Sequence, residues 1–275
     1  MASKVNENRS MHDLSVVLPC YRSARIARQS VSELRDFLEL GKFTWEIIVV
    51  DDGGGDFGSE PLSADDRIRL LVLPANIGKG GAVAAGMLSA RGAARIYTDI
   101  DLPYDLNLIF VAAELLLERL FHMVIGDRTM PSSQYGSELG FQRRVASRVF
   151  STFVGTIVTG GFFDTQCGLK GLRGDVAEEI FRLTRLTGFA FDVEVVYLGL
   201  FYHMDIKRIP VQLRRQELSS VRLVSDSFRM FVDVFRIKYH QLRGYYEDSQ
   251  LSAIVLEDFR SVAALANVRA TSRIV

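Results

Sequence analysis

The chain has 275 residues, 48% of them hydrophobic, which is enough for one large domain with a buried core. Its 33 basic and 33 acidic residues balance, so no overall positive field attracts nucleic acid, and we expect no nucleic-acid partner. Cys20 and Cys167 lie far apart without C-x-x-C spacing, which argues against a disulfide framework or a zinc site and favours a reducing compartment.

The polar residues 1–13 show no secretory signal. The longest apolar stretch, 193–204, is far shorter than the roughly 20 residues of a membrane span.

The first half of the chain alternates short apolar runs with segments of helical periodicity. In chain order, the patterns predict a strand over 14–19, a helix over 24–39, strands over 45–51 and 69–73, a helix over 80–90, a strand over 95–99, a helix over 106–120 and a strand over 123–126. The strands are almost continuously apolar, as strands buried on both faces are. We therefore predict an α/β fold with a mostly parallel sheet flanked by helices, which the second half completes.

Two carboxylates, Asp99 and Asp101, stand one residue apart at the end of a predicted strand. Such a pair can bind one hard divalent cation that keeps coordination positions open for substrate phosphates. A bound cation also neutralises the charge that grows on a diphosphate leaving group. A solvated turn is the alternative, but open α/β sheets bind their ligands at the carboxyl ends of strands, which favours the metal site.

Two other loops carry residues suited to a nucleotide. Asp51 and Asp52 precede three glycines, so the acids can accept hydrogen bonds from a base or ribose while the backbone approaches closely. Residues 76–82, Asn-Ile-Gly-Lys-Gly-Gly-Ala, open a helix whose N–H groups would favour an anion, with Lys79 adding positive charge. The alternatives are a flexible acidic turn and a plain Gly-rich turn, and the spacing of a P-loop is absent.

The order and spacing of these motifs resemble the family 2 inverting glycosyltransferases of the GT-A fold. The resemblance extends from about Ser15 to Tyr246. Its downstream parts, Asp-Thr-Gln-Cys-Gly-Leu-Lys at 164–170, Gly-Phe-Ala-Phe-Asp-Val-Glu at 188–194 and Ile-Pro-Val at 209–211, are similar to the branch of dolichyl-phosphate glucosyltransferases and dolichol-phosphate mannose synthases. We expect a flexible tail over 1–13, a Rossmann-like GT-A catalytic domain over 14–224 and a C-terminal helical extension over 225–275.

The resemblance implies a nucleotide-sugar donor, a UDP- or GDP-hexose, and a role for each matching residue. Mg²⁺ or Mn²⁺ would bind Asp99 and Asp101, with Asp101 the expected direct ligand. Gln166 lies in the motif that shapes the acceptor side. The residues expected to bind the nucleotide or its diphosphate are Pro19, Tyr21, Asp51, Asp52, Lys79 and Asp99.

The nature of the acceptor decides which further groups the chemistry needs. A phosphate acceptor is already anionic and needs cations, for which Arg128, Arg143 and Arg144 are candidates, although arginines on a helix are usually solvated. A hydroxyl acceptor needs a base, for which Asp192 is the first candidate and Glu194 the second. The motif at 164–170 favours a polyprenyl phosphate or another phosphate-bearing acceptor. The alternatives are transfer to a hydroxyl of a soluble metabolite, nucleotide-sugar binding without turnover, and nucleotidyl transfer, whose basic Gly-rich signature is absent.

The ends of the resemblance depart from the family pattern. Dolichyl-phosphate glucosyltransferases carry a membrane anchor ahead of the first strand, where this chain has few residues, so we expect a cytoplasmic protein whose membrane contact is at most peripheral. The family's aromatic and Gly-Ser-Lys signature is replaced by residues 212–222, in which Arg222 can match the lysine only after a register shift. Over 228–246, apolar and basic residues recur at helical spacing, which is typical of a helix on an anionic membrane surface and equally of one packed on the domain.

Overall fold

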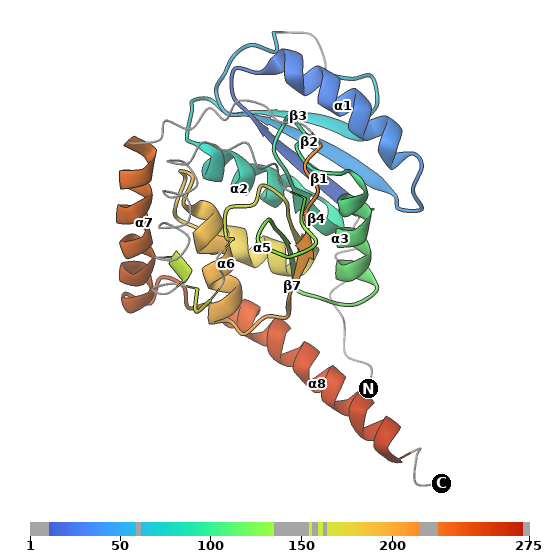
Figure 1. Cartoon of the computed structure of the whole chain (residues 1–275), viewed down its shortest axis with the longest axis vertical. Helices are drawn as coiled ribbons and strands as arrows, with labels where there is room; N and C mark the ends of the chain where they lie inside the picture. The colour runs from blue at the N-terminus through green and yellow to red at the C-terminus, as the bar shows by residue number, and fades with distance from the viewer. Residues whose placement is uncertain are drawn as a thin grey trace.

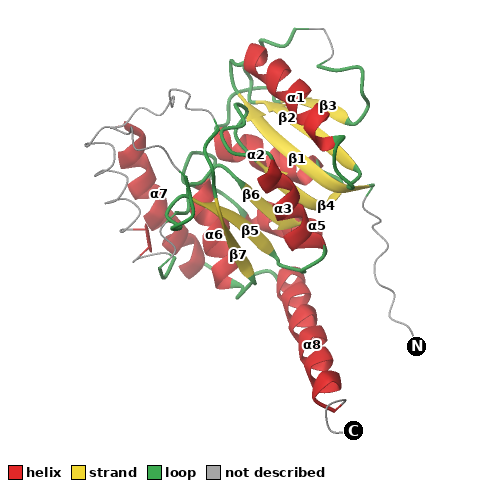
Figure 2. Cartoon of the chain, turned by 45° about the vertical axis from the view of Figure 1, so that its right-hand side comes forward, coloured by secondary structure: helices red, strands yellow, loops and turns green. Residues whose placement is uncertain are grey.

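The computed structural model describes residues 11–58, 62–134, 154–155, 159–161, 164–214 and 225–271. These residues form a seven-stranded sheet with the strand order β3-β2-β1-β4-β6-β5-β7, which lies between helices (Figure 2). Its strands are β1 (His12–Cys20), β2 (Trp45–Asp51), β3 (Ile68–Val72), β4 (Gly92–Tyr97), β5 (Met123–Asp127), β6 (Lys170–Arg173) and β7 (Ile206–Pro210).

The predicted mostly parallel sheet is confirmed. All neighbouring strands pair in parallel except β6, which runs antiparallel between β4 and β5. The strands β6 and β7 come from the second half of the chain, which therefore completes the same sheet. The five strands predicted in the first half are all present, within three residues of the predicted bounds.

Helices cover both faces of the sheet (Figures 1 and 2). On β1, Val16 and Leu18 point into one core and Val17 into the other, because side chains alternate along a strand. The first core is closed by α1 (Ala24–Leu38) and α3 (Asn107–Leu117), and the second by α2 (Lys79–Ser89), α5 (Gly174–Leu183) and α6 (Phe191–Phe201).

Two further helices follow the sheet. The helix α7 (Ser225–Leu242) packs outside α6, and α8 (Ser249–Thr271) contacts α5 before it extends away from the body (Figure 1). Leu251 and Val255 of α8 are buried, which anchors the beginning of that helix. Among the helices of the described ranges, none is both long and apolar enough to traverse a bilayer.

Small residues allow α2 to lie close to the sheet. A Cβ atom on Gly86 would lie 2.4 Å from Cγ1 of Val17 and 2.8 Å from Cγ2 of Val50. At the other end of the helix, a Cβ on Gly80 would lie 2.5 Å from Cβ of Phe191 in α6. The close packing of α2 fixes its first residue, Lys79, beside the carboxyl ends of the strands.

Replacing Gly86 by valine is expected to lower the free energy of unfolding by about 1–3 kcal/mol, because the new side chain must displace core residues. Urea unfolding followed by circular dichroism measures the change. Leu88→Val is the control, since Leu88 is on the same helix and 38% exposed. No loss at Gly86 would contradict close packing, because valine has a higher helix propensity than glycine and only steric conflict can make this change destabilising.

Candidate active site

An ion pair joins the two motifs that the sequence singled out for the donor phosphates. Nζ of Lys79, at the start of α2, lies 2.6 Å from Oδ1 of Asp99, just after β4, and both side chains are partly exposed. Burial lowers the pKa of Lys79, but the charges of Asp99, Asp192 and Asp101 outweigh it and raise the pKa above its ordinary value. The charges of three carboxylates therefore stabilise one ammonium group.

The turn that carries Asp99 and Asp101 is tightly constrained. The N–H of Leu102 donates to the carbonyl of Asp99 at 3.0 Å, and Leu102 is buried with φ 48°, in the left-handed region. Such conformations persist only where the surroundings enforce them, and they concentrate at functional sites. The carboxylate of Asp99 also lies against Gly168, where a Cβ would be 2.1 Å from its Oδ2 atom. The motif at 164–170 therefore borders the predicted metal site directly.

Asp99 and Asp101 offer hard oxygen donors of the kind that Mg²⁺ and Mn²⁺ prefer. Within the described residues, no group of three or more His, Cys, Asp or Glu side chains is arranged to hold a metal ion. A pair of carboxylates nevertheless fits a cation that takes its remaining ligands from water and substrate phosphates. The residues thus suit a metal that binds together with the donor.

A buried ion pair joins Asp192 and Lys170. Oδ1 of Asp192, in the first turn of α6, accepts from Nζ of Lys170 at 2.5 Å and from the hydroxyl of Tyr97 at 2.8 Å. Lys170 is fully buried, and its ammonium also donates to the carbonyl of Cys167 at 2.7 Å. Burial, followed by the charge and hydrogen bond of Asp192, raises the pKa of Tyr97 well above its ordinary value.

Lys170 and Tyr97 were missed as site residues by the sequence reasoning. Lys170 ends the 164–170 motif, and a lysine inside such a motif was the available signal. Tyr97 looks like one more apolar residue of β4, because nothing in the sequence indicates that its hydroxyl meets a residue 95 positions later.

Arg128, expected near the acceptor, is held by Asp164 of the same motif. Its guanidinium donates to both carboxylate oxygens of Asp164, with contacts of 2.6 and 2.9 Å, and its backbone N–H adds a bond of 2.6 Å. Burial disfavours the charged form of both side chains. The hydrogen bonds and the Coulomb attraction between Arg128 and Asp164 outweigh burial, so the pKa of Arg128 rises and that of Asp164 falls. Arg128 remains 27% exposed, whereas Asp164 is 4% exposed.

The remaining acceptor candidates are placed differently. Gln166 lies two residues after Asp164 and is partly buried. Arg143, Arg144 and Arg222 lie outside the described residues.

Asp51 and Asp52 are buried, and both bind backbone groups. Oδ1 and Oδ2 of Asp51 accept from the N–H groups of Gly54 and Gly55 at 2.8 and 3.2 Å. The oxygens of Asp52 accept from the N–H groups of Ile77 and Gly78 at 2.8 and 2.9 Å, which ties this loop to the segment before α2. The two acids therefore shape the loops at the predicted nucleotide side.

Pro19 and Tyr21 lie at the neighbouring end of β1. Pro19 is partly buried near the end of the strand, and Tyr21, just beyond it, is 43% exposed. The N–H of Asp52 donates to the carbonyl of Cys20 at 2.8 Å, so this end of β1 lies directly beside Asp52. Burial raises the pKa of the Cys20 thiol to about 12, so it stays protonated.

The start of α2 differs from the expected anion site. The N–H groups of Gly80 and Gly81 both donate to the carbonyl of Thr187, at 2.8 and 3.3 Å. Because the protein itself satisfies these donors, they do not face an anion in this structure. Lys79 is the group of this segment that offers positive charge.

Glu194, the second candidate for a base, lies on another side of α6 from Asp192. It is fully buried and accepts from the hydroxyl of Tyr246 at 2.5 Å and from the N–H groups of Arg185 and Leu186 at 3.0 and 2.8 Å. Burial raises the pKa of Glu194, although these three donors act in the opposite direction. Its contacts hold the loop whose Thr187 carbonyl caps α2.

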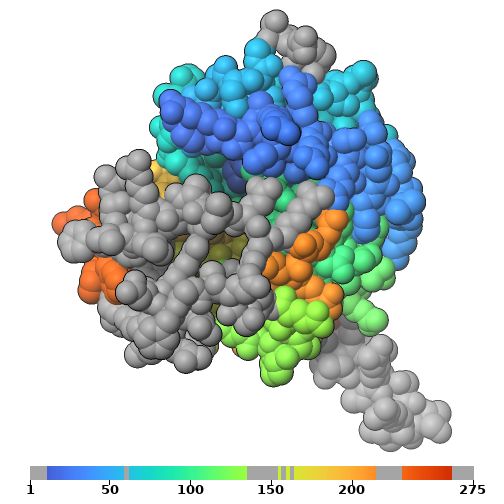
Figure 3. Space-filling model, turned by 45° about the horizontal axis from the view of Figure 1, so that its top comes forward, coloured from blue at the N-terminus to red at the C-terminus, as the bar shows by residue number. Residues whose placement is uncertain are grey.

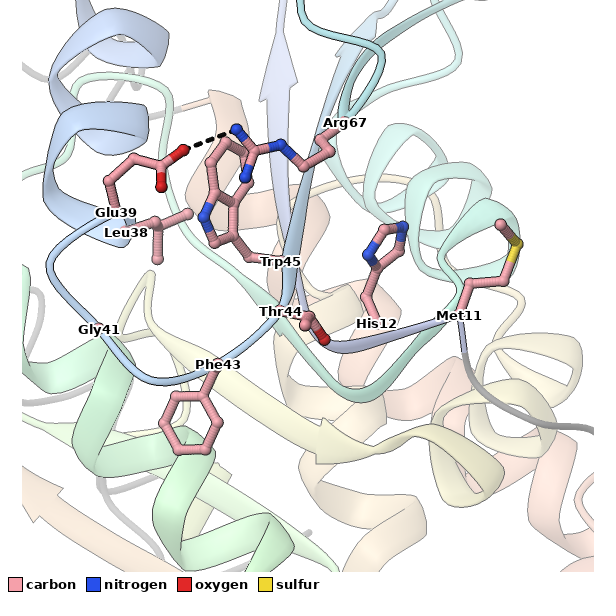
Figure 4. Close-up of a pocket in the computed structure, with 9 residues that line it drawn as sticks. All are labelled: Met11, His12, Leu38, Glu39, Gly41, Phe43, Thr44, Trp45 and Arg67. Carbon is pink, nitrogen blue, oxygen red and sulfur yellow. Dashed lines mark hydrogen bonds and ion pairs between the residues drawn. The ribbon is translucent and has the colours of Figure 1, made fainter.

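A cavity of about 410 Å³ lies apart from these residues, at the amino ends of β1 and β2 (Figure 4). The guanidinium of Arg67 lies 3.9 Å from the ring centre of Trp45 and pairs with Glu39 at 2.6 Å. Since the predicted site residues follow the carboxyl ends of the strands, this cavity is at the opposite end of the sheet.

Comparison with known proteins agrees with the fold and the motifs. A solved structure of glucosyl-3-phosphoglycerate synthase from Mycobacterium tuberculosis, with Mn²⁺, UDP-glucose and phosphoglyceric acid, has a TM-score of 0.59 over 84% of this chain and 81% of that chain, at 16% identity. Mannosyl-3-phosphoglycerate synthase from Rubrobacter xylanophilus has a TM-score of 0.57 over 84% of this chain and 74% of that chain, at 18% identity. These similarities support the GT-A fold.

The similarity in sequence is more specific. A dolichyl-phosphate beta-glucosyltransferase of Dictyostelium discoideum is 30% identical over 249 residues, which are 85% of this chain and 76% of that protein. The human dolichyl-phosphate beta-glucosyltransferase is 28% identical over 86% of this chain and 78% of its own length. The sequence profile of "Glycosyl transferase family 2" matches residues 15–181. With the fold and the ordered motifs, this match shows that the chain belongs to glycosyl transferase family 2.

Proposed function

We propose that the protein transfers glucose from a nucleotide diphosphate sugar to the phosphate of a polyprenyl phosphate, with inversion at C1 of the sugar. The observation that carries the choice of acceptor is the ion pair of Asp192 with the buried Lys170. A hydroxyl acceptor needs a carboxylate that is free to take a proton, whereas a phosphate oxygen attacks as an anion. The names of the dolichyl-phosphate relatives support the same choice.

On the donor side, we propose that Pro19, Tyr21, Asp51 and Asp52 border the nucleotide. The two acids keep their loops in place through backbone hydrogen bonds, and their remaining lone pairs can accept from a base or ribose. The UDP-glucose complex of the Mycobacterium tuberculosis enzyme makes UDP-glucose the first donor to test.

We propose that Asp101 and Asp99 bind Mg²⁺ or Mn²⁺ together with the donor. The bound cation would offset the charge that develops on the departing nucleotide diphosphate. Lys79 contributes a second positive charge beside Asp99 and can pair with a phosphate oxygen once the donor is present.

On the acceptor side, we propose that Arg128 orients the incoming phosphate, with Asp164 fixing its guanidinium. Gln166 of the same motif, together with Arg143 and Arg144, would complete the acceptor side. Lys170 neutralises Asp192 and holds it in place, so this carboxylate is engaged in the ion pair and is not needed as a base for a phosphate acceptor.

The double variant Asp192→Asn/Lys170→Met tests the choice between phosphate and hydroxyl. We expect it to keep transfer to a polyprenyl phosphate within about tenfold of the original rate, whereas loss of a general base costs on the order of 10² to 10⁴. Radiolabelled glucose transfer in detergent measures the rate. Lys170→Met alone is the matched comparison for stability, because it leaves a buried carboxylate unpaired at a cost of about 3–5 kcal/mol. A loss of 10³-fold or so in a folded double variant would favour a hydroxyl acceptor.

Metal removal provides a second test. Transfer is expected to stop in EDTA and to return with added Mn²⁺ or Mg²⁺. Asp101→Asn should raise the Mn²⁺ concentration for half-maximal activity by about tenfold or more, since it removes a charged oxygen ligand. Asp105→Asn is the control, because the carboxylate of Asp105 instead accepts from the backbone and side chain of Asn107. Full activity in EDTA would contradict the metal-dependent mechanism.

A third test uses the contact between Gly168 and Asp99. Gly168→Ala should displace the Asp99 carboxylate and lower transfer by on the order of 10 to 10² fold, because small misplacements of reacting groups are costly. The urea midpoint should change little, since the added methyl group meets the end of a partly exposed side chain and not the core. Gly188→Ala is the matched control, as the nearest atom to its new Cβ would be 4.0 Å away. Equal activity of both variants would mean that the position of Asp99 does not limit transfer.

A further inference from the structure

The helix α7 carries apolar residues on two faces, and the rest of the described chain covers only one of them. Val234 and Ile237 are fully buried against the domain. On the other side, Phe235 is 59% exposed, Tyr239 is 50% exposed and Leu242 is 85% exposed. Figure 1 shows α7 as the outermost element beyond α6, and Figure 3 shows part of it at the margin of the molecule.

The exposed residues form one continuous stripe with a basic border. The positions 232, 235, 239 and 242 recur at helical spacing and share one face. Arg236 and Arg243 are exposed on the neighbouring positions of that face. Asp233, which is 13% exposed, pairs with Arg236. We call the set of Val232, Phe235, Arg236, Tyr239, Leu242 and Arg243 the outer face of α7.

We propose that the outer face of α7 docks on a phospholipid bilayer that carries anionic headgroups, an inference that rests on the proposed polyprenyl phosphate acceptor. Apolar and aromatic side chains bordered by arginine are suited to the boundary between headgroups and acyl chains. The two arginines complement a negative surface, although the whole chain has a formal net charge of zero. A second copy docked through the same face would instead bring arginines against arginines.

The position of this face also suits a lipid-linked acceptor. The loop before α6 approaches α7 at Gly188. A Cβ atom on Gly188 would lie 4.0 Å from Oδ2 of Asp233 in α7. The adjacent Thr187 carbonyl holds the start of α2, where Lys79 begins the site. A bilayer against the outer face would therefore be separated from the loop that borders the active site by the width of one helix, about 10 Å.

Vesicle sedimentation tests the docking. The unmodified protein should sediment with vesicles of phosphatidylcholine and phosphatidylglycerol more than with phosphatidylcholine alone, and less in high salt. The variant Phe235→Glu/Leu242→Glu should reduce the bound fraction by about tenfold, because it puts charge into the apolar stripe. Leu40→Glu/Val72→Glu is the matched control, since these residues are 81% and 57% exposed on other elements. Equal binding of the two variants, or no binding by the unmodified protein, would overturn the proposal.

Activity measurements separate this proposal from the proposed function. The α7 variant should lose transfer to a long-chain polyprenyl phosphate in vesicles but keep transfer to a short, water-soluble prenyl phosphate. Vesicle binding without transfer to either acceptor would reject the proposed function and leave the docking intact. Transfer to both acceptors without vesicle binding would do the reverse. If the α7 variant only converted a dimer to a monomer in light scattering, the face would be a contact between copies and the membrane proposal would fail.

Discussion

The buried ion pair between Lys170 and Asp192 is the constraint around which the site is built. Two charges removed from water are stable only when they meet with good geometry, so the elements that carry them cannot move independently. Lys170 begins the antiparallel strand β6, Asp192 lies in the first turn of α6, and Tyr97, which also bonds Asp192, ends β4. One carboxylate oxygen thus fixes the junction of two strands and a helix.

Paired charges recur across the site. Three of its acids have a cation at short distance before any substrate arrives, in the pairs Asp99–Lys79, Asp192–Lys170 and Asp164–Arg128. A nucleotide diphosphate adds negative charge to this balanced arrangement, so it must either bring a cation or take Lys79 away from Asp99. Lys170 is fully buried and Lys79 is not, which makes Lys79 the lysine that can exchange partners.

The sequence predicted the parts of the fold that repeat a regular pattern. The strand Trp45–Asp51 was predicted at its observed bounds because it is a continuous apolar run between polar loops. The strand β6 was not predicted, because it has four residues and begins with a buried lysine. For the site, the order of the motifs assigned both Lys79 and Asp99 to the nucleotide diphosphate, and the structure pairs them. The backbone partners of Asp52 and Glu194 depend on loop conformations that no periodicity encodes.

The hydrogen bond from Tyr246 to Glu194 has a consequence for how such chains evolve and recombine. Tyr246, Leu251 and Val255 follow the sheet by many residues and yet belong to the core shared by α2, α5 and α6. A gene fusion or domain swap that divided the chain near residue 224 would remove part of that core, together with the donor that engages Glu194. The segment that must stay together for the domain to fold is therefore longer than the sheet and extends into the first turns of α8.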